Sequence, residues 1–184
     1  MKICHAYRVI DKVTNYKCPS LRIYLLIKTG LCYTVGMDKK TCFFMGNKHT
    51  PGSIKESLIE AVETHITEYG VNIFVVGRYG DFDSLVKPVL REAKKRHPEI
   101  LLYLLAPYAL IQQIETPIDF DGTLYPEGME TVPKPLAIVQ ANRKMIERSE
   151  YLITYSHKSF GNTQKIVEYA QRREKKGLIK VTFL

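Results

Sequence analysis

The sequence predicts an α/β fold, a three-layer sandwich in which a mainly parallel sheet of about five strands is flanked by helices. The first observation is that five short apolar runs alternate with longer segments of helical periodicity. The second is that these runs are apolar nearly throughout, as expected for strands covered on both faces. Right-handed crossovers join parallel strands in such sheets, so we expect a Rossmann-like arrangement.

The five apolar runs have the length and composition of strands. Four of them are rich in β-branched or aromatic residues, which favour the extended conformation. The predicted strands cover residues 41–45, 71–77, 100–105, 151–155 and 178–183.

Two amphipathic segments between the first three runs predict helices. Residues 53–70 have Ser53 as a plausible N-cap, Gly70 as the stop, and an apolar face made of Ile54, Leu58, Ile59, Val62 and Ile66. Residues 82–98 repeat the pattern, with Pro88 close enough to the start to be tolerated and Pro98 ending the helix.

The second half of the chain is less regular. Residues 106–135 contain five prolines and several acids, which predicts a long irregular connection with at most one helical turn near residues 108–113. Residues 142–171 predict the end of a helix, a short strand, a glycine-bearing turn and another helix.

Length and charge bound the domain organisation. The 184 residues suit one α/β domain. A break in pattern at Met37 separates residues 1–36, an extension that is either an added edge hairpin or an accidental upstream segment, from a domain at 37–184. Residues 1–36 hold six Lys/Arg and one acid, a net +5 of the total +8, so the remaining +3 is a mild bias. We therefore do not expect nucleic acid as a partner.

The cysteines indicate neither a metal site nor a disulfide framework. Cys4, Cys18, Cys32 and Cys42 form no CxxC pair and no Cys/His spacing typical of zinc. We expect a reducing, cytoplasmic location, no metal and no cofactor. The longest apolar run near the N-terminus, "IYLLI", is far shorter than a membrane span, so no membrane partner is expected.

Polar turns follow the predicted strands, and in this fold such turns meet at one rim of the sheet. They read "GNKHTPG", "GRYGDFD", "APY" and "SHKSFGNT". Glycine allows a backbone to approach a ligand closely, and a helix amino end after a strand binds phosphate. Each turn alone also has a purely structural explanation, because Gly and Asn are ordinary turn residues.

The segments "FFMGNKHTP", "VVGRYGDFDSLV", "LLAPY", "NRKMIERSEYLITY" and "FGNTQKIVEYA", in this order, resemble the SLOG superfamily of Rossmann-like domains. This superfamily includes the LOG phosphoribohydrolases and the DprA/Smf proteins, and the resemblance is strongest to its small YpsA-like branch. It runs from about Met37 to the C-terminus. What it implies is a nucleotide or nucleotide-derived ligand on the rim.

Three motifs depart from the YpsA-like pattern. Residues 46–48 read Gly-Asn-Lys where the pattern has Gly-His-Arg, which puts recognition there in doubt. Residues 141–143 read Ala-Asn-Arg in place of Arg-Asn-Arg. Residues 161–163 read Gly-Asn-Thr in place of Gly-Gly-Thr, an exchange that the turn tolerates if Asn adopts a left-handed φ.

The candidate ligand-binding residues lie on these rim turns or in the Asn-Arg motif: Gly46, Asn47, Lys48, Gly77, Gly80, Asp83, Asn142, Arg143, Gly161, Asn162 and Thr163. Arg143 is either a solvated helix residue or the cation that meets a phosphate or carboxylate, and the motif favours the second. Thr163 caps a helix or binds phosphate, and the two roles are compatible. Asp83 either caps its helix or contacts the ligand.

Two functions remain open after the resemblance. One is a binding module that senses or sequesters a nucleotide derivative, and the alternative is a LOG-like hydrolase that cleaves the N-glycosidic bond of a nucleoside monophosphate. LOG proteins carry a glutamate three residues beyond the turn threonine, where this chain has Ile166. Isoleucine cannot transfer a proton, so binding ranks above hydrolysis and no catalytic residue is assigned. The expected partner is a nucleotide-derived small molecule, with a homo-oligomer possible.

Overall fold

The computed structural model describes residues 23–26, 40–108, 119–156 and 161–184, which form a seven-stranded sheet. Its strands are β1 (Ile23–Leu26), β2 (Lys40–Gly46), β3 (Val71–Val76), β4 (Leu101–Leu105), β5 (Gly122–Pro126), β6 (Tyr151–Tyr155) and β7 (Lys180–Phe183). The order across the sheet is β1-β5-β4-β3-β2-β6-β7. Strands β2 to β7 are parallel, and β1 pairs with β5 in the antiparallel direction.

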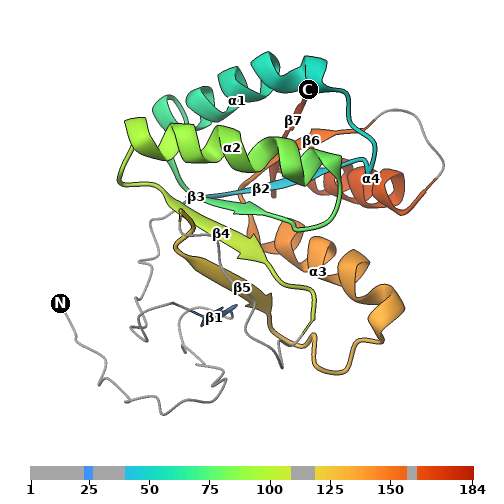
Figure 1. Ribbon diagram of the computed structural model, residues 1–184. Coiled ribbons are helices and arrows are strands. Elements are labelled where there is room, and N and C mark those ends of the chain that lie inside the picture. The colour runs from blue at the N-terminus through green and yellow to red at the C-terminus, as the bar shows by residue number, and fades with distance from the viewer. Residues whose placement is uncertain (1–22, 27–39, 109–118, 157–160) are drawn as a thin grey trace, which may run out of the picture.

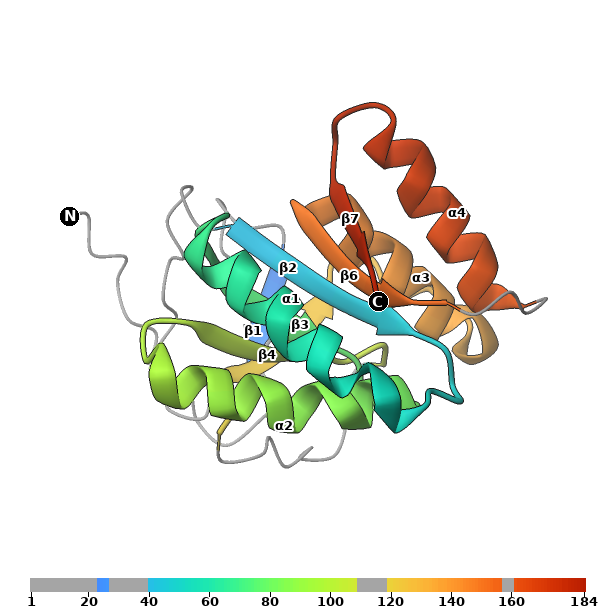
Figure 2. The same ribbon diagram turned by 90° about the horizontal axis from the view of Figure 1, so that it is seen from above.

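The four α-helices of the described residues cover the two faces of the sheet. Figures 1 and 2 show this arrangement. Helices α1 (Lys55–Thr67), which follows the 3-10 turn η1 (Gly52–Ile54), and α2 (Asp81–Arg96) lie on one face. Helices α3 (Lys134–Arg148) and α4 (Asn162–Glu174) lie on the other. The predicted Rossmann-like three-layer α/β sandwich is confirmed.

The chain reverses direction across the sheet between β2 and β6. From β2 it proceeds outward through β3, β4 and β5, and it then returns to β6 and β7 on the other side of β2. The helix after β2 covers one face and the helix after β6 covers the opposite face. This topological switch point opens a crevice at the carboxyl ends of the strands.

The interior contains two apolar clusters, one on each side of the sheet. Phe44, Phe74 and Leu58 belong to the cluster under α1 and α2. Met145 and Ile146 belong to the cluster under α3 and α4. Strand residues alternate between the two clusters, which is why the strands are apolar nearly throughout.

The five predicted strands are present, but a sixth parallel strand was missed. Strand β5 lies within residues 106–135, for which we expected an irregular connection. It begins with Gly122 and ends with Pro126, two residue types that disfavour a strand, yet all five of its residues are buried. Pairing with β4 and β1 decides its conformation. The helical turn expected at 108–113 falls mostly outside the described residues.

The first helix also differs from the prediction in detail. Ser53 lies inside η1 and makes no capping hydrogen bond, whereas Gly70 ends the segment with a φ of 67° as expected. On the apolar face Ile59 is exposed, and His65 is buried instead. Within the described part of the chain, no helix is long and apolar enough to cross a bilayer.

Candidate functional site

A small cleft of about 40 Å³ lies at the switch point and contains several of the predicted ligand-binding residues. It is lined by the ends of β2 and β3 and by residues of α2 and α3. Of the candidates, Gly46, Gly77, Asp83 and Asn142 line it, together with Arg78, which the sequence analysis did not select. We call this the rim cleft.

The two glycines of the rim cleft are required for packing within the protein. A Cβ on Gly46 would overlap the ring of Phe82, and a Cβ on Gly77 would overlap the carboxyl group of Asp83. Both neighbours belong to the first turn of α2. The close approach that the glycines allow is therefore between strand and helix, and it explains them without a ligand.

Asp83 is the most perturbed carboxyl group of the rim cleft. Its side chain is 8% exposed, and one oxygen accepts a hydrogen bond of 2.9 Å from the backbone N–H of Tyr79. Burial raises the pKa of Asp83 to about 7, although that hydrogen bond and the nearby Lys87 both act to lower it. Asp83 thus helps to fix the start of α2, and its carboxyl group stays protonated to a higher pH than that of an exposed aspartate.

A backbone contact joins the first two rim turns. The N–H of Asp81 donates to the carbonyl of Lys48 at 2.9 Å, and the N–H of Asn47 donates to the carbonyl of Tyr155 at 3.1 Å. Gly80 has a φ of 124°, a conformation that favours glycine. Asn47, Lys48 and Gly80 therefore lie together beside the rim cleft.

Arg143 and the turn before α4 do not line the rim cleft. Arg143 is directed from α3 toward α4. Its Nε lies 3.3 Å from Glu147 on α3, and its guanidinium carbon lies 4.5 Å from the centroid of the Tyr169 ring on α4. Gly161 precedes α4, and Asn162 and Thr163 open it without a side-chain capping bond. The structure thus brings four of the eleven candidates into one cleft and places the others around it or on α3 and α4.

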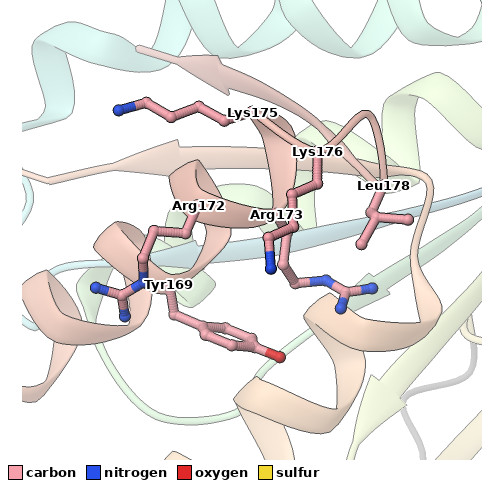
Figure 3. A pocket seen from close by; sticks show the side chains of 6 residues that line it. All are labelled: Tyr169, Arg172, Arg173, Lys175, Lys176 and Leu178. Atoms are coloured by element: carbon pink, nitrogen blue, oxygen red, sulfur yellow. The ribbon is translucent and has the colours of Figure 1, made fainter.

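A second feature, missed by the sequence analysis, is a shallow hollow of about 390 Å³ at the C-terminal end of α4. We call it the basic groove. It is lined by Tyr169, Arg172, Arg173, Lys175, Lys176 and Leu178. Figure 3 shows the Tyr169 ring between the guanidinium groups of Arg172 and Arg173, whereas Lys175 points away from them.

Glu147 on α3 orders the side chains at one end of the basic groove. Its carboxylate accepts a hydrogen bond of 2.7 Å from the hydroxyl of Tyr169 and lies 3.3 Å from the Nε of Arg143. Its backbone carbonyl accepts a bond of 3.3 Å from Arg173, whose own Nε is buried without a hydrogen-bond partner among the described residues. Arg143, Tyr169 and Arg173 form a series of planar groups held between two helices.

The local charge explains why the sequence analysis overlooked this surface. Residues 161–184 contain six Lys/Arg and two Glu, a net charge of +4, whereas residues 37–160 contain 15 Lys/Arg and 16 acids, a net −1. Averaging over all residues after 36 hid this segregation. The run "QRREKK" was the signal that could have revealed it.

The described residues contain no cluster of three His, Cys, Asp or Glu side chains that could hold a metal ion. Cys42 is fully buried, and burial raises the pKa of its thiol far above the usual range, so it is an inert core residue.

Comparisons with known proteins give a likeness of structure and none of sequence. No family model matches the sequence, and no curated protein matches it. Among solved structures, DNA processing protein A from Helicobacter pylori, studied for its unique single-stranded DNA binding mode, is similar over 77% of this chain and 74% of that chain. The sequence identity is 14% and the TM-score 0.47, so the likeness is one of fold.

This finding corrects two expectations. The similar protein binds single-stranded DNA. This contradicts the expected function, which was binding of a small nucleotide-derived ligand or, as the alternative, hydrolysis of an N-glycosidic bond. It also contradicts the expectation that nucleic acid is not a partner. The physical reason for the error lies in this chain, because the net charge gave no information about the basic groove on α4.

Proposed function

We propose that this protein binds single-stranded nucleic acid along the basic groove of α4. The observation that carries the proposal is the arrangement of one aromatic ring, Tyr169, between the guanidinium groups of Arg172 and Arg173 in an open hollow. Single-stranded nucleic acid offers phosphates to cations and unpaired bases to flat side chains, so both kinds of group in the groove have a partner.

The basic groove contains more cations than are needed to stabilise the C-terminus of α4. Arg172 and Arg173 lie in the last turn of α4, where positive charge stabilises the helix C-terminus. Lys175 and Lys176 continue the cluster beyond the helix end, both are exposed, and neither forms an ion pair with another residue that the structure describes. A cluster that extends past the helix favours an external anion with several charges.

Two acidic groups within this region have partners in the protein. Glu174 accepts a hydrogen bond of 2.7 Å from the N–H of Val181, and Glu147 is bound by Tyr169 and Arg143. Both carboxylates are thus held against other groups of the protein, and each keeps its negative charge. The surface that remains for a ligand is basic and partly apolar, with Leu178 51% exposed.

A single strand suits this groove better than a duplex. The planar groups at the groove are the half-buried Tyr169 ring and the guanidinium groups beside it, that of Arg143 4.5 Å and that of Arg173 6.0 Å from the ring centroid. Such groups bind the faces of bases, and these faces are hidden by stacking and pairing in a double helix. The sequence resembles the SLOG superfamily, which includes the DprA/Smf proteins, and within it the YpsA-like branch. This resemblance is compatible with the proposal.

Fluorescence anisotropy with oligonucleotides of roughly 16 nucleotides, the upper end of common site sizes, tests the proposal. Single-stranded DNA and RNA should bind more tightly than the corresponding duplex, and the two single strands decide which sugar is preferred. Each phosphate contact on a single strand contributes about 0.7 to the slope of log K against log salt. The double variant Arg172→Ala, Lys176→Ala should therefore lower the slope by about 1.4.

The matched control is the double variant Lys55→Ala, Lys95→Ala. It removes the same charge from α1 and α2, on the opposite face of the sheet. Its binding and salt slope should equal those of the unaltered protein. Equal losses in both double variants would show a nonspecific charge effect, and an unaltered protein that binds no single strand would overturn the proposal.

A further inference from the structure

We infer that the bound single strand continues from the basic groove around the β7 edge of the sheet to a second stacking site on the opposite face. This inference rests on the proposed function. The second site consists of Tyr69, Tyr151 and Lys180, with Lys40 beside it, and we call it the tyrosine site. It lies beside β7, the outermost strand on that side of the sheet.

The tyrosine site contains two parallel aromatic rings. The rings of Tyr69 and Tyr151 are stacked with centroids 5.4 Å apart and an angle of 5° between their planes. His65 meets both of them edge-on, at 5.1 Å and 5.4 Å. His65 is buried, and burial is the main cause that lowers its pKa, so a neutral imidazole supports the two rings from the protein side.

Two lysines add positive charge to these rings. The Nζ of Lys180 lies 3.7 Å from the centroid of the Tyr69 ring, a cation–π contact, and Lys180 is opposite Tyr151 in the pairing of β7 with β6. Lys40 donates a hydrogen bond of 2.6 Å from its Nζ to the carbonyl of Tyr69. Both lysines are exposed, so their charges face solvent beside a flat aromatic surface.

Strand β7 connects the tyrosine site with the basic groove. Ile179 and Val181 pack into the cluster under α3 and α4, on the side of the groove. Lys180 lies over Tyr69, and Thr182 lies 3.5 Å from His65, both on the side of α1. Successive residues of β7 therefore face opposite sides of the sheet, and the strand is the boundary that a ligand would cross.

The separation of the two sites is short enough for one ligand. Lys176 in the groove precedes Lys180 by four residues, which reach at most about 14 Å when fully extended. Lys175 directly precedes Lys176 in the chain and points away from the other cations of the groove, as Figure 3 shows.

Packing alone does not account for the tyrosine site. The contact between the two rings stabilises the junction of α1 with the sheet, as ring pairs commonly do. It does not require a lysine on the solvent side of Tyr69. Two acids nearby, Glu68 and Glu150, oppose this charge, and Glu150 also accepts a hydrogen bond of 2.7 Å from the N–H of Thr41.

Binding measured as a function of oligonucleotide length tests the second site. Affinity of the unaltered protein should rise with length in two stages, the second marking contact with the tyrosine site. Lys180→Ala should lower affinity for long single strands by up to about 5-fold, as for loss of an exposed charge contact, and leave short strands unaffected. Lys165→Ala, which removes the same charge near the other end of α4, is the control and should change neither.

Photocrosslinking gives a second readout that does not depend on a substitution. A single strand with 5-iodouracil near one end should crosslink to Tyr69 or Tyr151, and one with 5-iodouracil near the other end to Tyr169, as mapped by mass spectrometry. Crosslinks confined to Tyr169, with Lys180→Ala behaving like Lys165→Ala, would overturn the second site alone. Failure of the unaltered protein to bind any single strand would overturn the proposed function as well.

Discussion

The guanidinium carbon of Arg143 on α3 lies 4.5 Å from the centroid of the Tyr169 ring on α4. This pair joins two helices that cover the same face of the sheet, and Glu147 holds both partners. The flat surface of the basic groove thus depends on the packing of α3 against α4. Four predictions concern this surface and the rim cleft, and one concerns the N-terminal segment.

Replacing Tyr169 separates the roles of its ring and its hydroxyl. Tyr169→Leu should weaken binding of a single strand by about 1–3 kcal/mol, the usual contribution of a base stacked on an aromatic ring. Tyr169→Phe keeps the ring and should bind nearly as well, while losing at most about 1 kcal/mol of stability with the hydrogen bond to Glu147. Anisotropy and chemical denaturation measure the two effects. Equal binding by both variants would exclude stacking.

Neutralising Glu147 should strengthen binding. Glu147→Gln removes a negative charge beside Arg143 and Arg173 while retaining an oxygen that can accept the Tyr169 hydroxyl. Less repulsion of phosphate should then increase affinity and steepen the dependence on salt. The measurement is a salt titration at constant pH, with Glu99→Gln, which alters an exposed acid in the turn between α2 and β4, as the control. A lower affinity would mean that Glu147 chiefly positions Arg143.

Asp83 should make the stability of the protein depend on pH. The folded state holds the proton on Asp83 up to a pH of about 7, whereas an exposed aspartate releases it near 3.8. Between these two values the folded state binds more protons than the unfolded state, so the free energy of unfolding falls as pH rises. The upper limit of this loss is roughly 4 kcal/mol, and it is complete above the folded pKa.

The variant Asp83→Asn isolates this effect. Its amide oxygen can still accept the N–H of Tyr79, but the side chain does not ionise. Relative to the unaltered protein it should gain stability as pH rises from about 4 to 7, as urea denaturation at several pH values would show. The charged groups facing Asp83, namely Lys87 with Arg78 and Arg91 near it, remain in both proteins. A constant difference in stability across this range would refute the prediction.

Gly46 should be intolerant of any side chain. Gly46→Ala places a Cβ against the ring of Phe82, and such overpacking typically costs about 1–3 kcal/mol. Gly161→Ala is the matched control, because no described atom outside its chain neighbours lies within 4 Å of its Cβ position. Thermal denaturation of both variants measures the difference. Similar melting temperatures would mean that α2 shifts readily away from β2.

A chain that starts at Met37 should still fold cooperatively. The main sheet from β2 to β7 and both apolar clusters lie within 40–184. Of residues 1–36, β1 is described, and it pairs with the edge of β5. Circular dichroism should show a single melting transition for the truncated chain. Loss of a cooperative transition would place the extension within the core.

Several parts of the site were beyond prediction because they depend on contacts between distant residues. Strand β5 has little local signal and is defined by its neighbours β4 and β1. His65 occupies the apolar face of α1 because Tyr69 and Tyr151 pack around it. A helical pattern does not reveal such partners, since it reports only the periodicity of one segment.

The sequence by itself determined the parallel sheet, the covering helices and the rim at which polar turns meet, because strand and helix periodicities are local properties. Only the tertiary structure decided which charges act together. Tyr169 and Glu147 are 22 residues apart in the chain, yet they share a hydrogen bond because α3 and α4 pack on the same face. The cations of the basic groove are neighbours in the sequence, but only the structure shows that they line one hollow together with the Tyr169 ring. Local charge density rather than net charge determines attraction for a polyanion.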